Sequence, residues 1–468
     1  MTGTWQNYAA YVDQNPNSNI NKALTSASGV GEALIPEKLE EAITQTILRL
    51  APEVAMVLAK FLRTKKISFN RVTSIPAAGA AMGEISTTPT TSSATDRVEV
   101  EMKKFKRKGQ VSDFLQETAA DYIDSLAFET ENQIQAFAYD LQICLVYGNP
   151  IADEYTYGGL DYFIATHREN LATASQVQTS LLVLDRMITK NTRLQGASHR
   201  KAFLISPELL SQLSSLWTVV RDTRGAKREG TAGVLVDGGY VLETYRHVPF
   251  IETTSTRPTY QEGTSTEHMG AIALGSTGTG SVLGAGTYHI RVAPINRDGE
   301  QIASTAGSNI VITNQDQIQI TFTAVPNTYY YKVYLSSTGS GDEVLVSVRS
   351  AFTYDANGTQ TGVVSQINLD QVTPDTSAPV HMQSDIPLDR DGTSGEPMEI
   401  LILWDLDEVQ GLGRYRYTNS GGSQLENLIG VELLSRVDDR TDFLMKHYGA
   451  LANSLEKTSY MVRGIRTA

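Results

Sequence analysis

The chain has 468 residues, of which 41% are hydrophobic, and a formal net charge of −13 at pH 7. A chain of this length exceeds one ordinary core, so its length predicts two or three domains. The acidic balance argues against tight nucleic-acid binding by the whole surface, because neutralising phosphates requires clustered Lys and Arg.

The first part of the chain predicts an arm, a helical segment and a hairpin. Residues 1–35 are polar and lack periodicity, so we expect an arm that orders only against another surface. Over 36–65, Pro36 at a first helical position and apolar residues at helical spacing predict helix. Residues 66–112 alternate as two strands around a polar tip, which predicts an extended β-hairpin. Because a two-stranded ribbon is marginal alone in water, we expect it to lie on a neighbouring subunit.

The strongest helix signal in the chain runs from 113 to 147. Asp113 and Gln116 have capping-box spacing, apolar residues including Leu115 then hold one face, and Gly148 supplies the stop. At about 1.5 Å per residue, this pattern predicts one continuous rod roughly 50 Å long. Cys144 falls near the apolar face, where we expect a buried structural thiol.

A strand-rich insertion interrupts a mixed α/β pattern. Short buried strands are expected at 202–205 and 399–404, on either side of it. Residues 270–385 carry four Lys or Arg against nine Asp or Glu, and show short alternating strands with turn signals between them. This pattern predicts an all-β sandwich. Because Thr-, Ser- and Pro-rich linkers flank it, we expect it to fold independently, with few contacts to its host.

The sequence offers no motif for catalysis or metal binding. It contains no Gly-Lys pair of a phosphate loop, no H-E-x-x-H and no G-x-S-x-G elbow. The seven histidines are scattered without ligand spacing, and the single cysteine excludes an internal disulfide framework. No apolar run or leader predicts a membrane span or a secretion signal. We therefore expect no enzymatic activity, no cofactor and no metal site.

A basic run stands out against the acidic balance between 103 and 108. On a strand, these side chains would dock electrostatically on an acidic neighbouring subunit. The alternative is a solvated strand edge kept soluble by lysines, with phosphate contact as a third interpretation. The candidate contacts between subunits are Lys103, Lys104, Lys106, Arg107 and Lys108.

The order of these parts resembles the major capsid proteins of tailed double-stranded DNA bacteriophages, over about residues 1–250 and 398–468. The order and spacing of several short segments carry the resemblance. These segments are Gly31-Glu32-Ala33-Leu34-Ile35-Pro36, Phe105 to Phe114, Tyr147-Gly148-Asn149-Pro150, Tyr157-Gly158-Gly159-Leu160, and Phe443 to Ala452 with His447-Tyr448-Gly449-Ala450-Leu451.

The resemblance implies an α+β tailed-phage capsid fold with an inserted all-β sandwich. Tyr330 to Ser337 and Phe352 to Asp355 make the insertion similar to a fibronectin type III or other immunoglobulin-like module. The implied parts are an N-terminal arm (1–35), a helical segment (36–65), an extended loop (66–112), a peripheral domain with the spine helix (113–200 and 429–457), an axial domain (201–252 and 398–428, with 458–468 returning to it) and the insertion (268–385).

The resemblance implies a structural protein and not an enzyme. Copies of the chain would assemble as hexamers and pentamers into an icosahedral head around double-stranded DNA, in the host cytoplasm, and end in the virion. Expected partners are other copies, portal, scaffold and cement or decoration proteins, and DNA contacted weakly from inside, with no membrane. The insertion would decorate the outer surface and be dispensable for shell closure. The alternatives are an encapsulin-type compartment shell, which shares the fold, and a carbohydrate-binding surface protein.

Overall fold

In the computed structural model, the predicted N-terminal arm (1–35) and residues 36–52 of the predicted helical segment lie outside the described residues. The prediction of helix up to residue 65 is wrong at its end, because Ala59–Leu62 forms a strand, β1, that pairs with a strand from near the end of the chain. The structure describes 53–54, 59–62, 66–74, 76, 92–119, 124–164, 167–170, 181–193, 198–213, 234–236, 240–242, 244–256, 269–277, 283–301, 303–304, 309–313, 316–338, 343–370, 398–414, 430–434, 439–453 and 458–466.

The predicted rod from 113 to 147 is wrong as a single helix. The structure has a short helix α4 (Asp113–Ala119) and a long helix α5 (Ser125–Tyr147). Asp124 has extended backbone, and its side chain accepts hydrogen bonds from the amides of Leu126 and Ala127 at 3.1 Å. Asp124 is therefore an N-cap at which α5 begins. The 23 residues of α5 span about 34 Å.

Gly148 ends α5 as the sequence predicted, but for a steric reason. Its amide donates to the Cys144 carbonyl at 2.9 Å, and its φ of −52° is one that any residue adopts. A Cβ at this position would lie 2.2 Å from the Tyr157 carbonyl oxygen. The glycine is therefore required because the chain of the following turn passes against it.

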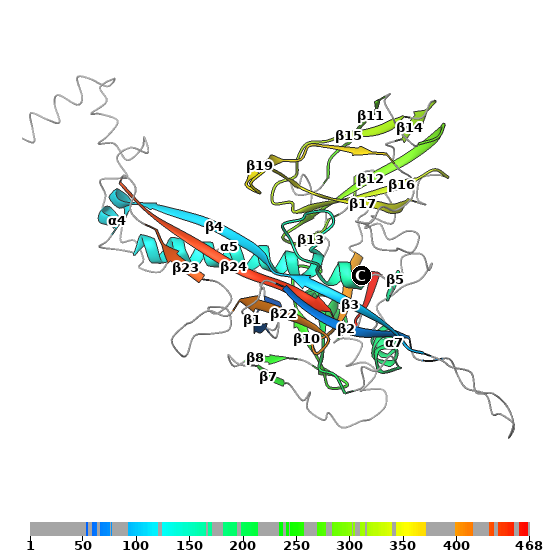
Figure 1. The fold of residues 1–468 in the computed structure, drawn as a ribbon, viewed down its shortest axis with the longest axis horizontal. Helices are drawn as coiled ribbons and strands as arrows, with labels where there is room; N and C mark the ends of the chain where they lie inside the picture. The colour runs from blue at the N-terminus through cyan, green and yellow to red at the C-terminus, as the bar shows by residue number, and fades with distance from the viewer. Residues whose placement is uncertain are drawn as a thin grey trace, which may run out of the picture.

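One mixed sheet covers a face of α5 (Figure 1). Strand β4 (Lys103–Ser112) pairs with β24 (Arg440–Asn453) along almost its whole length. Phe443 and Met445 of β24 pack with Phe137 and Leu141 of α5 in one core. The remaining strands of this sheet are β23 (Gly430–Leu433), β22 (Val409–Arg414) and β1 (Ala59–Leu62).

The predicted hairpin forms, but it is shorter than expected. Strands β2 (Lys66–Ser74) and β3 (Ala94–Glu101) pair antiparallel with each other. The following stretch, predicted to continue the hairpin to residue 112, instead forms β4 and joins β24. Most of the predicted polar tip lies outside the described residues.

A second sheet gathers strands from the middle and the end of the chain. The two predicted buried strands are β6 (Lys201–Ile205) and β21 (Met398–Asp405), which are direct neighbours. Helix α7 (Leu181–Asn191) packs on this sheet through Leu184 and Met187. The other strands of the sheet are β25 (Tyr460–Arg466), β5 (Arg168–Asn170), β10 (Val248–Glu252) and β9 (Thr244–Tyr245), while β7 (Val234–Val236) and β8 (Tyr240–Leu242) pair apart from it.

The inserted segment is all-β, and its strands fall where alternation predicted them. Two sheets pack against each other around a shared apolar core. Its assignment to the immunoglobulin-like class stays a prediction. One sheet contains β11 (Ala273–Thr277), β15 (Gln317–Thr321) and β20 (Gln366–Leu369); the other contains β12 (Gly286–Asn296), β13 (Gly299–Glu300), β14 (Asn309–Ile312), β16 (Tyr330–Ser336) and β17 (Val344–Ser350); β18 (Phe352–Tyr354) and β19 (Gln360–Val363) form a hairpin.

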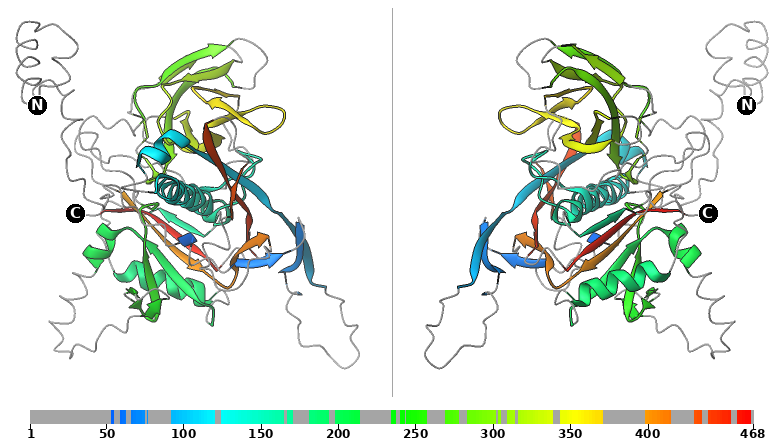
Figure 2. Two further views of the ribbon diagram at one scale, coloured as in Figure 1. Left: turned by 90° about the vertical axis from the view of Figure 1, so that its left-hand side faces the viewer. Right: turned by 90° about the vertical axis from the view of Figure 1, so that its right-hand side faces the viewer.

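The expectation of few contacts between insertion and host is wrong. Figures 1 and 2 show the insertion seated directly over α5. On β16, Tyr331 and Val333 face the partner sheet of the insertion, whereas Tyr330 and Tyr334 pack into the main core. That core also holds residues of α5 and Leu160 of the short helix α6 (Leu160–Phe163). One sheet of the insertion is therefore buried on both faces and forms a layer of the body.

A buried ionic network joins the same two parts. The Glu300 carboxylate accepts from Lys332 Nζ at 2.8 Å and from the Tyr334 hydroxyl at 2.6 Å. It also pairs with Arg463 of β25, and Lys332 lies 2.9 Å from Asp161 of α6. All of these charged side chains are almost fully buried. Since an unpaired buried charge is costly, each part depends on charges that the other supplies.

Candidate assembly surface

The alternation of strand β4 divides the basic run between two faces of its sheet. Side chains of successive strand residues point to opposite faces, and burial along β4 alternates accordingly. Lys103 and Arg107 share the face that packs on α5. Lys104, Lys106 and Lys108 share the opposite face and are exposed.

The two inward-facing residues, Lys103 and Arg107, form hydrogen bonds within the subunit. Lys103 Nζ donates to the Glu154 carbonyl at 2.7 Å, in the turn that follows α5. Arg107 donates from Nε to Gln133 at 2.7 Å and from Nη1 to Asp140 at 2.8 Å, both on α5. Arg107 therefore holds β4 to α5, and Lys103 holds it to the turn after α5, roles that the sequence did not predict.

The three outward-facing members are arranged differently from one another. Lys108 Nζ lies 2.6 Å from Asp442, and Lys104 Nζ lies 5.4 Å from the centre of the Tyr448 ring. Lys106 lies beside Lys104, whose hydrogen-bond contact and charge lower the pKa of Lys106. Within the described residues, Lys104 and Lys106 form no ion pair with a carboxylate. Contact of the basic run with another subunit stays a prediction, and these two exposed lysines are its best candidates.

The β2–β3 hairpin projects from the body (Figure 2). Among its described residues, Val100 at the base packs against the main core. Farther out, Arg71 and Asp96 pair across the two strands at 3.2 Å, and Val72 is 59% exposed. Among the described strands, none other pairs with this ribbon.

Apolar side chains are exposed near the start of α5. On α4, Phe114 is 71% exposed and Leu115 is 52% exposed, although the sequence placed Leu115 on the buried face. On β23, Leu433 is 66% exposed. Uncovered apolar side chains of this size are typical of surfaces that meet another protein.

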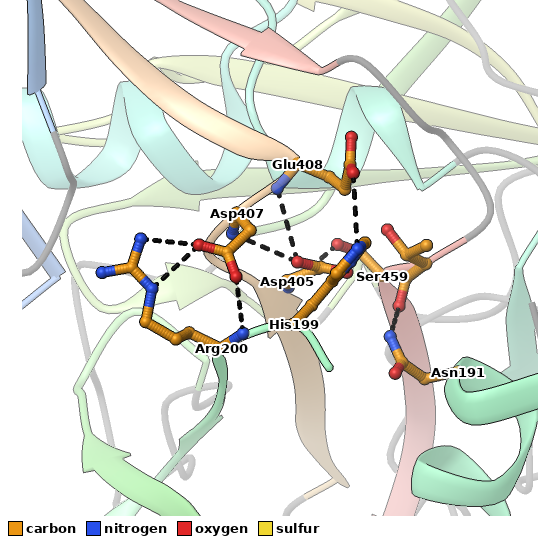
Figure 3. Close-up of polar contacts among 8 residues, drawn as sticks. Asn191, His199, Arg200, Asp405, Asp407, Glu408 and Ser459 are labelled. Atoms are coloured by element: carbon orange, nitrogen blue, oxygen red, sulfur yellow. Dashed lines mark hydrogen bonds and ion pairs between the residues drawn. The ribbon is translucent and has the colours of Figure 1, made fainter. Parts of the chain in front are cut away.

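Figure 3 shows a polar cluster at one end of the second sheet that superficially resembles a catalytic group. His199 Nδ1 lies 2.8 Å from Asp405, and this contact raises the pKa of His199. Asp405 also accepts from the amides of Asp407 and Glu408, and the Ser459 hydroxyl accepts from the Asp405 amide. Among the described contacts, none joins His199 to Ser459. The hydrogen bonds of the cluster therefore fix the turn after β21.

The described part of the chain contains no group of three or more His, Cys, Asp or Glu side chains placed to hold a metal ion. None of the helices described there is long and apolar enough to cross a membrane.

Comparison with known proteins gives matches only at the level of solved structures. No protein-family model matches the sequence, and no curated protein matches it. The chain is similar to the cyanophage A-1(L) capsid, with 11% identity, a TM-score of 0.46, and coverage of 94% of this chain and 98% of that one. It is similar to the capsid of a native GTA particle, with 8% identity, a TM-score of 0.43, and coverage of 94% of this chain and 99% of that one. It is also similar to the holo-SrpI encapsulin complex from Synechococcus elongatus, with 10% identity, a TM-score of 0.42, and coverage of 94% of this chain and 96% of that one.

Proposed function

We propose that this chain is a shell subunit, the major capsid protein of a tailed bacteriophage. Copies assemble as hexamers and pentamers into an icosahedral head that encloses double-stranded DNA. The chain acts by assembly and not by catalysis. It is made in the host cytoplasm and ends in the virion, where portal, scaffold and cement proteins are its further partners.

The projecting β2–β3 hairpin is the observation that carries this proposal. The described residues of both strands are mainly exposed, and among them Val100 at the base packs against a core. A two-stranded ribbon of this kind is marginal alone in water and needs another surface to lie on. A neighbouring copy supplies that surface in a shell. The exposed apolar side chains of α4 and β23 add a second contact region of the same molecule.

Negative-stain electron microscopy of the purified chain tests the proposal. We expect closed particles of uniform size, together with free capsomers in size-exclusion chromatography. A chain that stays monomeric at all concentrations and salt conditions would contradict a shell function and favour a carbohydrate-binding surface protein. Particles that enclose protein cargo and exclude nucleic acid, when purified from infected or expressing cells, would favour an encapsulin-type compartment.

A further inference from the structure

The face of the β4–β24 sheet that points away from α5 gathers positive charge. The register places Lys106 directly opposite Lys446, and Lys104 opposite Tyr448. Lys108 and Arg440 lie farther along the same face. We call this set the lysine face. It consists of Lys104, Lys106, Lys108, Arg440, Lys446 and Tyr448.

The positive charge of the lysine face exceeds the negative charge beside it. Asp442 pairs with Lys108 at 2.6 Å, and Glu432 of β23 pairs with Lys446. Lys104 and Lys106 remain next to each other, and their mutual contact lowers the pKa of Lys106. The chain has a net charge of −13, yet these positive charges lie side by side and repel one another. A bound anion would reduce this repulsion.

The chemistry of the lysine face favours a polyanion over a protein partner. The centres of protein interfaces are enriched in aromatic, Met and Arg side chains and depleted in Lys. On this face, the apolar member nearest the lysines is Leu444, opposite Lys108, and it is only half-buried. Lysines two residues apart on a strand recur every ~6.6 Å. Such a row of flexible cations matches repeated phosphates without a shaped pocket.

The position of the lysine face also fits a polyanion inside a shell. Figure 1 looks down the shortest axis of the subunit, and β4 and β24 lie in front of α5 in that view. Because the opposite face of this sheet packs on α5, the lysine face looks along the thin dimension of the molecule. In a shell one subunit thick, neighbours meet at the rims of the subunit, whereas this side looks into or out of the shell.

We propose that the lysine face binds the phosphate backbone of double-stranded DNA, without sequence selection, on the inner side of the shell. This inference rests on the proposed function, which supplies the enclosed DNA. Lysine contacts to phosphates carry affinity but no sequence information.

Binding of a short blunt-ended DNA duplex of random sequence to unassembled subunits tests the inference. Fluorescence anisotropy gives the association constant over a series of salt concentrations. We expect the triple variant Lys104→Gln, Lys106→Gln, Lys446→Gln to bind at least about tenfold more weakly at low salt. Its slope of log affinity against log salt should be smaller by about 2.7, which is ~0.9 for each phosphate that the variant no longer neutralises. The corresponding triple Lys→Arg variant should keep the wild-type slope.

A second triple variant controls for net charge. Arg193→Gln, Arg200→Gln and Arg246→Gln remove the same charge from exposed positions elsewhere, and should leave the slope unchanged. An unchanged slope in the lysine-face variant would overturn the inference. If the variant with the unchanged slope also associated with itself more weakly than wild type in sedimentation, and did so in a salt-dependent way, the lysine face would be a contact between copies.

Shell formation is scored separately by microscopy, so that the two proposals fail independently. DNA binding through the lysine face by a chain that never forms shells would count against the proposed function alone. Shells from a chain whose subunits do not bind the duplex would count against this inference alone.

Discussion

Single residues decide how tightly the β4–β24 sheet approaches α5. Gly109 of β4 lies against the Phe443 ring, and a Cβ there would come within 2.1 Å of the ring carbon Cζ. Phe443 is fully buried in the core with α5, so its ring has little room to move. We expect Gly109→Ala to lower the free energy of unfolding by about 1–3 kcal/mol, the usual cost of overpacking, as measured by urea unfolding.

Gly275→Ala is the matched control for this prediction. It places the same methyl group on β11, where the nearest atom, Gln319 Oε1, is 3.7 Å away. This substitution should leave the unfolding curve close to wild type. Equal effects of the two substitutions would show that steric contact with Phe443 is unimportant.

His199 should make stability depend on pH. Its hydrogen bond to Asp405, together with the charges of Glu408 and Asp407, raises its pKa in the folded chain above the ordinary value of 6.5. The folded state therefore binds the proton more tightly than the unfolded state. The stabilisation is fully present below pH 6.5 and is lost as pH rises through the raised folded-state value.

Thermal unfolding of the His199→Gln variant across this pH range tests the linkage. Wild type should gain stability relative to this variant as the pH falls through the folded-state pKa of His199 towards 6.5. Identical pH profiles for wild type and His199→Gln would refute the assignment.

At the scale of elements, we propose that the β2–β3 hairpin acts on a neighbouring copy of the chain. Deleting residues 73–95 removes its outer end and leaves its base, including Val100, in the core. We expect the shortened chain to stay folded, with a melting temperature near wild type, but to give free capsomers or monomers in place of stable shells. Normal shells in negative-stain images would show that the hairpin is not an assembly element.

At the scale of the whole molecule, the insertion and its host share one core. Replacing residues 268–385 with a short Gly-Ser linker would uncover the apolar residues of α5 and α6 that the insertion now covers. It would also leave Arg463 and Asp161 without Glu300 and Lys332. Since each large apolar side chain loses roughly 1.5–3 kcal/mol on exposure, we expect the shortened chain to aggregate or to melt at a much lower temperature.

Circular dichroism melting and size-exclusion chromatography of that variant measure the dependence. Adding residues 268–385 as a separate chain should restore part of the soluble yield, because the two surfaces are complementary. A monodisperse shortened chain with wild-type melting temperature would instead support a dispensable decoration.

Local patterns in the sequence determined the elements themselves. Period-two alternation located the strands of the insertion, including β12, β16 and β17, and short apolar runs located β6 and β21 of the host. The stop at Gly148 was likewise visible. These features are readable because the 3.6-residue and two-residue periods are properties of a few adjacent residues. The break before α5 was missed because apolar spacing continues across Asp124.

Only the tertiary structure decided which face each element covers. The sequence presents the basic run as one group, but pairing with β24 turned Lys103 and Arg107 inward and left Lys104 and Lys106 exposed. The linkers of the insertion predicted few contacts with its host, yet Glu300 and Lys332 are buried in a network that joins the two parts. A sequence shows a charged residue but not its ion-pair partner. Burial of that charge becomes favourable only when a distant segment places an opposite charge beside it, as β25 places Arg463 beside Glu300.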